Sequence, residues 1–480
     1  MEIRTAEVRQ QELPICVDLD GTLVKTDTLI ESSLALLHRN WFYLLLFPWW
    51  LLRGRALLKR RIAERTPLNV ASLPYNEELL SLLQGERKKG RRLVLATAAD
   101  QIIASRIADH LGCFAEVLAS NGSRNLKGAA KLRVLEKRFG AKGFDYAGNS
   151  RADVAVWRGS NRAIVVAPSS SLAAHLPEDR IVVGRAPTFR ARLLALIAAL
   201  RMHQWAKNIL LFLPMVTAHN LAPHIIGKAA LAFGSFSLFA SANYLINDLL
   251  DLAADRNHER KRFRPFASGE LPLGWALAGI PLALAAGTAC ALLTTSAFVA
   301  YLAVYLACAI LYSVRIKRIV LADVLLLAAL YDIRIMAGGS AVDIPISQWL
   351  LGFSMFLFLS LAFVKRYSEL RAVRLRNGDG SPGRGYVRGD LELLLPFGIG
   401  SGYLSVLVLA LYLNSPEVRV LYFRPQVLWL TCPVLLYWIS RIWMMAYRGE
   451  MDEDPVLFAV TDKVSYAAGL IIGAIMLWAL

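Results

Sequence analysis

The stretch "NYLINDLLDLAADRNHERKRFRPFASG" (243–269) decides how this chain is organised. It ends an apolar run long enough to span a membrane, yet it carries Asn247, Asp248, Asp251 and Asp255. Positions 247, 251 and 255 are four residues apart, which places them on one face of a helix. Acidic groups at the end of an apolar helix are costly unless they meet cations. We therefore predict that these oxygens hold Mg²⁺ and, through it, a substrate diphosphate. The alternative is a solvated charge cluster beside the membrane.

The sequence around this stretch is a series of apolar segments. A bilayer-spanning helix needs about 20 apolar residues. The loops after the second, fourth, sixth and eighth segments are rich in Lys and Arg, which by the positive-inside rule places them in the cytoplasm. We expect a multi-pass protein of the inner (plasma) membrane, with the N-terminal half and all active sites cytoplasmic. The nine candidate spans lie near 205–222, 226–246, 272–294, 297–313, 319–339, 346–364, 391–412, 423–445 and 460–480.

The composition supports this division. Of 480 residues, 56% are hydrophobic and 19% are charged, and the net charge is +17. These values exclude a disordered chain, a disulfide scaffold and a wholly soluble protein. The basic balance favours an anionic membrane face and phosphorylated substrates. A nucleic-acid partner is not expected, because no basic stretch is interleaved with aromatic residues in a soluble part.

A second motif lies near the N-terminus, in "PICVDLDGTLVKTDTL" (14–29). A short apolar run that reads as a β-strand ends at Asp18, and Asp20 follows two residues later. Gly21 permits the bend that would bring both carboxylates to one metal ion. A carboxylate beside Mg²⁺ can attack phosphorus, and a second carboxylate can move the proton. The motif therefore predicts phosphoryl chemistry.

This motif resembles the start of haloacid-dehalogenase-like phosphohydrolases, and later motifs follow in order: "RRLVLATAA" (91–99), "NLKGAAK" (125–131) and "FDYAGNSRADVAVW" (144–157). The resemblance implies a Rossmann-like α/β domain over 1–190, with a small helical cap at about 25–90. It implies Asp18 as nucleophile and Asp20 as acid/base. Thr97 and Lys127 would bind the phosphate, with Lys127 balancing charge. The implied Mg²⁺ ligands are Asp18, Asp20, Asn149 and Asp153; Asn149 departs from the usual aspartate and removes one negative charge.

The 243–269 stretch, with its NxxxDxxxD pattern followed by "RPFASG", resembles UbiA-type intramembrane prenyltransferases. The resemblance covers about 195–480 and implies an all-α membrane domain of about nine helices. The usual second DxxxD motif is missing. The comparable stretch, 311–339, offers Tyr312, Lys317, Asp323, Asp332 and Arg334 instead.

One branch of that family, the decaprenyl-phosphate phosphoribosyltransferases, is more similar. The segments that carry this resemblance are "RMHQWAKN" (201–208), "DRNHERKRFRP" (255–265), "YSVRIKR" (312–318), "RIMAGG" (334–339) and "FVKRYSEL" (363–370). It implies transfer of 5-phosphoribose from phosphoribosyl diphosphate to a polyprenyl phosphate in the membrane, followed by removal of the 5-phosphate by the N-terminal domain. A homo-oligomer stays open. The alternative is an aromatic (quinone-type) prenyltransferase that carries a silent or unrelated phosphatase-like domain.

The expected site of the membrane domain divides by role. The implied metal ligands are Asn247, Asp248, Asp251 and Asp255, of which Asp251 and Asp255 are the catalytic pair. The extra cations suit a donor and an acceptor that both carry phosphate, although each also has an ordinary topological explanation. The remaining expected substrate-binding residues are Arg201, Gln204, Lys207, Asn208, Asn247, Arg256, Lys261, Arg264, Tyr312, Lys317, Arg334, Lys365 and Arg366.

The segment "NWFYLLLFPWWLL" (40–52) is apolar but too short to span a bilayer, and Pro48 interrupts it. Basic residues follow it. Two interpretations stay open from the sequence. The segment either lies in the membrane interface or packs inside a soluble core.

Overall fold

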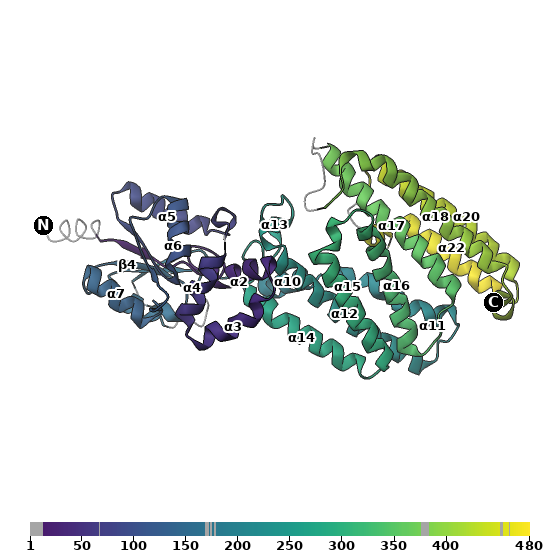
Figure 1. Cartoon of the computed structure of the whole chain (residues 1–480), viewed down its shortest axis with the longest axis horizontal. Helices are drawn as coiled ribbons and strands as arrows, with labels where there is room; N and C mark the ends of the chain where they lie inside the picture. Colours follow the sequence, from purple (N-terminus) through teal and green to yellow (C-terminus); the bar gives the residue numbers. More distant parts are fainter. Residues whose placement is uncertain are drawn as a thin grey trace. The chain divides into compact units, whose positions relative to one another are not determined.

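A computed structural model describes residues 13–66, 68–168, 172, 175–176, 179–375, 384–451, 455–459 and 461–480. The chain divides into two compact units. The first comprises the chain up to Leu200 together with Leu245–Gly279, and the second comprises Arg201–Tyr244 and Ile280–Leu480. Each unit is described by itself. Figure 1 shows a sheet with flanking helices in the purple and blue part of the chain, and helices alone in the green and yellow part.

The first unit contains a six-stranded parallel sheet with the strand order β3-β2-β1-β4-β5-β6. The order reverses between β1 and β4, and the carboxyl ends at such a switch point form the usual binding crevice. The expected Rossmann-like domain is confirmed. The strands are β1 (Ile15–Val17), β2 (Leu93–Asp100), β3 (Glu116–Ser120), β4 (Asp145–Gly148), β5 (Ala163–Val166) and β6 (Arg180–Val183).

Alternating side chains of the strands build a core on each face of the sheet. Ile15 and Val17 pack with one cluster, whereas Cys16 between them packs with the other. A buried parallel sheet needs apolar residues on both faces, which explains the continuous apolar runs. Helices α5 (Glu77–Lys88) and α6 (Gln101–Leu111) cover the first face, and α7 (Ala129–Phe139) and α8 (Val154–Gly159) cover the second.

Four α-helices and one short 3₁₀ helix lie between β1 and β2, and the first three α-helices form a separate group. They are α2 (Thr28–Arg39), α3 (Tyr43–Leu52) and α4 (Arg55–Arg65). Asp27 caps α2 by accepting hydrogen bonds from the backbone N–H groups of Leu29 and Ile30. The next helix, α5, contributes Leu79 and Leu83 to the core of the sheet. The cap is therefore built from α2, α3 and α4.

The second unit is helical. Among the residues that the structure describes, seven helices are long and apolar enough to cross a membrane: Pro223–Leu250, Leu273–Ala291, Ser296–Val314, Ala322–Val342, Gln348–Val373, Arg388–Leu413 and Pro425–Arg448. In Figure 1 these seven spans carry the labels α12 (Pro223–Leu250), α14 (Leu273–Ala291), α15 (Ser296–Val314), α16 (Ala322–Val342), α17 (Gln348–Leu375), α18 (Leu391–Leu413) and α20 (Thr431–Arg448). Helices α12 and α14 each contribute residues to both units.

The first and last of the nine expected spans take a different form. The first is broken into the 3₁₀ helix η3 (Met202–Phe212) and the short α11 (Leu213–Thr217), preceded by α10 (Phe189–Leu200). The last is α22 (Lys463–Ala479), an apolar helix of 17 residues. Seven spans satisfy the length requirement, and the count of nine stays a prediction.

Small residues let the helices of the second unit pack closely. A Cβ added to Gly398 of α18 would lie 2.0 Å from the Trp443 ring on α20. Ser360 of α17 lies at the same crossing, where its hydroxyl donates to the Gly398 carbonyl at 2.6 Å and accepts from the Trp443 indole at 3.0 Å. Close approach through small residues, with hydrogen bonds across helices, is typical of membrane bundles.

Candidate active sites

Asp18 stands at the carboxyl end of β1, in the switch-point crevice. Its backbone N–H donates to the Ala147 carbonyl of β4 at 2.9 Å, which ties the two central strands together. The Nζ of Lys131, on α7, lies 2.8 Å from Asp18 Oδ1. Burial raises the pKa of Asp18 above its ordinary value, and the Lys131 charge opposes that rise. The Asp18 carboxylate thus lies in direct contact with a buried ammonium group.

The lysine at this carboxylate is Lys131 and not the expected Lys127. Lys131 lies inside α7, and its Nζ also donates to the Tyr146 hydroxyl at 2.7 Å and lies 3.7 Å from Asp153 Oδ1. Lys127 precedes the helix, in the loop that ends at Gly128. The motif "NLKGAAK" contains both lysines, and the start of the helix decides which one faces Asp18.

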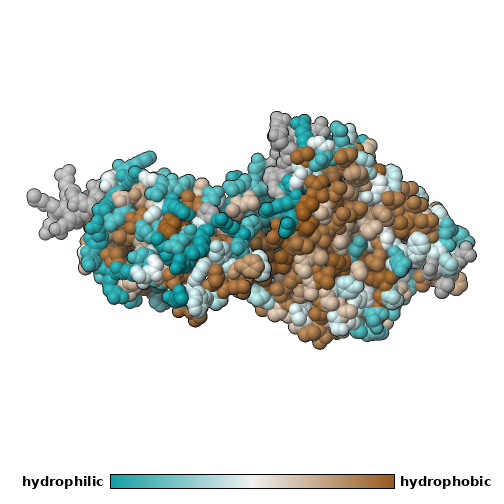
Figure 2. All heavy atoms as spheres, viewed as in Figure 1, coloured by the Kyte–Doolittle hydropathy of each residue, from teal (hydrophilic) through white to brown (hydrophobic). Residues whose placement is uncertain are grey.

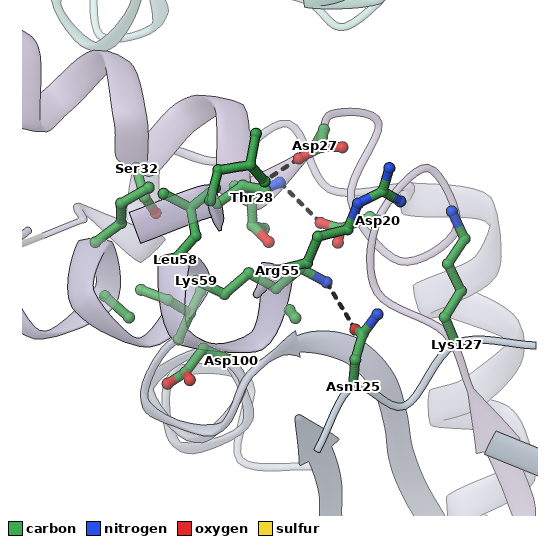
Figure 3. Close-up of a pocket in the computed structure, with 16 residues that line it drawn as sticks. Asp20, Asp27, Thr28, Ser32, Arg55, Leu58, Lys59, Asp100, Asn125 and Lys127 are labelled. Carbon is green, nitrogen blue, oxygen red and sulfur yellow. Dashed lines mark hydrogen bonds between the residues drawn. The ribbon is translucent and has the colours of Figure 1, made fainter. Parts of the chain in front are cut away.

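Asp20 faces a pocket of about 260 Å³ below the cap. Its Oδ1 accepts a hydrogen bond from the Thr28 backbone N–H at 2.8 Å. Burial raises the pKa of Asp20 to about 7, and the nearby charge of Asp27 adds to that effect. Lys59 and Lys127 lie in the same lining (Figure 3). With Arg55, which also lines it, the pocket combines a carboxyl group able to carry a proton near neutral pH with three basic side chains.

The loop after β4 carries Asn149 and Asp153. Asn149 Oδ1 accepts from the Thr22 hydroxyl at 3.2 Å. Asp153 accepts hydrogen bonds from the Tyr146 hydroxyl at 2.8 Å and, through Oδ2, from the hydroxyl and backbone N–H of Ser150 at 2.7 and 3.0 Å. Asp153 therefore orders the loop, and its direct binding of a metal stays a prediction.

Thr97 is fully buried in β2, and its Oγ1 accepts a hydrogen bond from the Ala99 backbone N–H at 3.0 Å.

Across the described part of the chain, no group of three or more His, Cys, Asp or Glu side chains is arranged to hold a metal ion. In the switch-point crevice, the predicted ligand set of Asp18, Asp20, Asn149 and Asp153 contains an amide where a fourth carboxylate is usual. An amide oxygen is still a hard ligand that suits Mg²⁺.

The 243–269 motif keeps its helical repeat although its helix is interrupted. Helix α12 ends at Leu250, and α13 (Leu252–Arg256) follows. The backbone N–H of Asp251 still donates to the Asn247 carbonyl at 2.9 Å, and that of Asp255 donates to the Asp251 carbonyl at 2.8 Å. These bonds keep the three predicted ligands on one side of the chain.

Within this motif, the two buried carboxylates Asp248 and Asp255 share one arginine. Arg264 Nη1 lies 3.3 Å from Asp248 Oδ1 and 2.6 Å from Asp255 Oδ2. Burial raises the pKa of Asp255, and Arg264 opposes the rise. The buried Oδ1 of Asn247 has no hydrogen-bond partner among the described residues. An orphaned amide oxygen among carboxylates is the donor set that a hard cation would complete.

Arg256 makes a contact that the sequence did not predict. Its Nη1 and Nη2 lie 3.1 and 2.5 Å from the two carboxylate oxygens of Glu31 on α2, and its Nε donates to the Ala267 carbonyl at 3.0 Å. Both side chains are buried. Its guanidinium is bonded to Glu31 and to its own loop, and the expected binding of substrate by Arg256 stays a prediction.

The second unit contains a buried polar group around Arg334 of α16. Arg334 Nε donates to Asn208 Oδ1 at 3.0 Å, and the Asn208 amide donates to the Ser237 hydroxyl at 3.0 Å. Arg334 Nη2 donates to the Tyr305 hydroxyl at 3.2 Å, and the guanidinium lies 5.2 Å from the centre of the Phe236 ring. The structure thus brings together Asn208 and Arg334, two expected substrate-binding residues.

A second cluster surrounds Arg366 of α17, which is almost completely buried. Its Nε donates to Asp323, its Nη1 lies 2.5 Å from Glu369 Oε2, and its Nη2 donates to the Tyr312 hydroxyl at 2.5 Å. The Tyr386 hydroxyl donates to the other oxygen of Asp323 at 2.5 Å. Arg366 and Tyr312 therefore belong to a buried polar network, and their expected substrate-binding role stays a prediction.

Other expected residues are placed on elements of the same unit. The Arg201 guanidinium lies 5.0 Å from the centre of the Tyr244 ring. Gln204 and Lys207 lie on η3, Lys317 on η5 (Ile316–Arg318) and Lys365 on α17. Lys261 lies in the first unit, on η4 (Lys261–Phe263). The phosphate that each of them would bind stays a prediction.

Comparison with known proteins identifies both parts. The UbiA prenyltransferase family model matches residues 208–461. The chain belongs to the UbiA prenyltransferase family. In this UbiA-family chain a second model, haloacid dehalogenase-like hydrolase, matches residues 15–158. It is thus a multi-pass membrane enzyme with a haloacid-dehalogenase-like domain at its N-terminus.

Three related proteins show which members of the family this UbiA-family protein is similar to. Protein y4nM of Sinorhizobium fredii is 36% identical over all of this chain and 93% of its own length. Nodulation protein NoeC of Azorhizobium caulinodans is 36% identical over 58% of this chain and 92% of its own length. A decaprenyl-phosphate phosphoribosyltransferase of Mycolicibacterium smegmatis is 39% identical over 37% of this chain and 57% of its own length. The expected fusion of the two domains is confirmed.

Proposed function

We propose that the membrane domain transfers 5-phosphoribose from phosphoribosyl diphosphate to a polyprenyl phosphate, and that the N-terminal domain then removes the 5-phosphate. The observation that carries the proposal is the 39% identity to a decaprenyl-phosphate phosphoribosyltransferase, which covers 37% of this chain. The missing second DxxxD motif also argues against a donor bound by two aspartate clusters.

In the transferase step, Asn247, Asp251 and Asp255 would hold Mg²⁺. When bound, this ion supplies charge neutralisation for a leaving diphosphate. Lys261, which is next to the motif, would bind the outer diphosphate oxygens. The bond between ribose C1 and the diphosphate breaks, and an oxygen of the lipid phosphate forms the new bond to C1. The attacking phosphate is already ionised, so the protein mainly positions two anionic substrates and needs no general base.

In the phosphatase step, Asp18 attacks phosphorus and forms an aspartyl phosphate, while Asp20 gives its proton to the departing ribose oxygen. Water then releases inorganic phosphate and restores Asp18. Lys131 holds the Asp18 carboxylate in place. A tethered domain meets the lipid product at a high effective concentration. The sequence of two steps would yield polyprenylphosphoryl ribose, a cell-envelope precursor of arabinose type.

The test is an assay in detergent micelles with Mg²⁺, radiolabelled phosphoribosyl diphosphate and a polyprenyl phosphate. We expect label to enter the organic phase, to be absent with Asp251→Asn, and to keep its 5-phosphate with Asp18→Asn. Lipid labelling that Asp18→Asn does not change would leave the transferase and reject the phosphatase step. An absence of lipid label with wild-type protein would reject the ribosyl reaction and favour a prenyl diphosphate donor with an aromatic acceptor.

A further inference from the structure

Helix α3 of the cap is apolar on both sides, although it lies on the surface. Its inner side packs Tyr43, Phe47 and Trp50 against α2 and α4. Its outer side leaves Leu45 70% exposed and Leu52 83% exposed. Figure 2 shows hydrophobic atoms over the part of the surface where Figure 1 labels α3. Exposed apolar patches of this kind mark an interaction surface.

The outer side is formed by large apolar side chains, whose exposure to water is unfavourable. Besides Leu45 and Leu52, Trp49 is 54% exposed, and Trp41, two residues before the helix begins, is 65% exposed. A helix that is hydrophobic all round is expected to be buried. Because α3 has only 10 residues, it is too short to cross a bilayer. It has the length and composition of a segment that lies in an interface.

Basic residues continue directly from α3. Residues 53–65 contain six Lys or Arg and a single acidic residue, Glu64. The Arg53 guanidinium lies 4.7 Å from the centre of the Trp49 ring, so a cation and an aromatic ring lie together at the end of the apolar helix. Aromatic rings and Arg side chains are favoured at the headgroup level of membranes. The charge therefore complements an anionic lipid surface.

The same two helices form a wall of the phosphatase pocket. Leu51 of α3 and Arg55, Leu58 and Lys59 of α4 line the pocket that contains Asp20 (Figure 3). Lys59 Nζ donates to the Ala98 carbonyl at 2.6 Å and to Asn125 Oδ1 at 3.2 Å, which fixes one cation in the lining. Anything that positions α3 and α4 therefore also positions the entrance side of the pocket.

We propose that α3 inserts into the headgroup region of an anionic bilayer, so that the phosphatase pocket receives a phosphate monoester carried by a membrane lipid. A bilayer is always available to this cap, because the chain itself carries membrane-spanning helices. Insertion of α3 is independent of the reaction proposed above. The assignment of a lipid-borne phosphate as substrate rests on that proposed function and deepens it.

The insertion is tested with the full-length protein in nanodiscs of phosphatidylcholine and phosphatidylglycerol. A spin label is attached at position 45, in a variant whose five cysteines are replaced, and collision rates with oxygen and with a water-soluble nickel chelate are measured. Exposed Gln84 on α5 carries the label in the control. We expect oxygen to dominate at position 45 and nickel to dominate at position 84. Equal nickel access at both positions, or protection of position 45 from both reagents by a protein partner, overturns the proposal.

If the cysteine-free protein does not fold, a photo-crosslinking amino acid at position 45 in the otherwise unchanged chain replaces the label. Crosslinks to lipid at position 45 and none at position 84 support insertion. Crosslinks to protein alone, or equal crosslinking at the two positions, reject it.

The substrate class is tested by the double variant Leu45→Glu/Leu52→Glu, with Gln84→Glu as the matched control. Loss of membrane docking should lower hydrolysis of a lipid-linked sugar phosphate by about tenfold or more, because the pocket is no longer held at the headgroup level where the lipid phosphate lies. Hydrolysis of soluble p-nitrophenyl phosphate should stay within about twofold, because this substrate reaches the pocket from water. An unchanged rate with the lipid substrate overturns the substrate assignment, and so does an equal loss with both substrates. Wild-type protein that hydrolyses neither substrate rejects the proposed phosphatase function and leaves the spin-label result standing.

Discussion

Replacing Lys131 by Met is expected to stop the phosphatase step, whereas replacing Lys127 by Met is not. The Lys131 ammonium lies 2.8 Å from Asp18 and 3.7 Å from Asp153 and is almost completely buried. With an effective dielectric constant of 20, Coulomb's law gives about 6 kcal/mol for a 2.8 Å separation. Desolvation offsets part of this attraction, and breaking a buried ion pair costs about 3–5 kcal/mol.

The consequence for catalysis follows from that free energy. Without the ammonium group, the Asp18 carboxylate loses its cation, its pKa rises further, and less of it is ionised to attack phosphorus. If about 3 kcal/mol of the interaction is lost in the transition state, kcat falls about 100-fold. Met keeps the length of the side chain, so packing changes little.

The assay follows phosphate release from p-nitrophenyl phosphate by the full-length protein in micelles. Lys127→Met is the matched control, because Lys127 lines the substrate pocket and is expected to raise KM while kcat is retained. The reasoning would be refuted by a Lys131→Met protein whose kcat stays close to wild type. A large loss of kcat in Lys127→Met alone would also refute it and restore the assignment made from the sequence.

Three further changes test other parts of the structure. Asn149→Asp restores a carboxylate and should strengthen Mg²⁺ binding about tenfold or more. The measurement is a titration of phosphatase activity with Mg²⁺. An unchanged dependence on Mg²⁺ would contradict the placement of this residue at the metal. Arg366→Met removes the nearest cation from Asp323 and Glu369 and leaves them Arg384, at 3.9 and 3.2 Å. It should destabilise the membrane domain by up to about 3–5 kcal/mol, seen as a lower midpoint of thermal unfolding in micelles. An unchanged midpoint with a raised KM would indicate substrate binding instead. Gly338→Ala places a Cβ 2.3 Å from the Leu211 carbonyl oxygen and should lower the free energy of unfolding by about 1–3 kcal/mol, measured in the same assay. Gly400→Ala, with no atom within 4 Å of the new Cβ, should leave the free energy of unfolding unchanged.

The parts of the fold that depend on local sequence were predictable. The strand before Asp18 and the acidic motif at 247–255 are short patterns whose residues act near one another in the chain, and both lie where they were expected. The first membrane segment was not predictable from hydropathy. Met202–Phe212 forms a 3₁₀ helix after Arg201, which has a positive φ of 50°. Apolar content alone does not distinguish a continuous helix from a broken one.

The roles of the cations were harder to predict, because Arg looks the same in the sequence whether it meets a ligand or a carboxylate. Arg366 was expected to bind phosphate, and in the folded chain its guanidinium forms ion pairs with Asp323 and Glu369. Its partners are 43 and 3 residues away, and only the folded chain brings the more distant one to it. Glu31 had no motif to mark it, and it was identified through its contact with Arg256.

The contact between Glu31 and Arg256 has a consequence for protein engineering. The compact unit that contains the sheet also takes in Leu245–Gly279, and Gly269 approaches the Lys25 backbone so closely that a Cβ would lie 2.9 Å from its carbonyl oxygen. A cut after residue 200 would leave Glu31 as a buried carboxylate without its arginine. The N-terminal domain cut off at that point is therefore expected to be less stable than the same domain in the full chain, and Glu31→Gln should restore part of that stability by removing the unpaired buried charge.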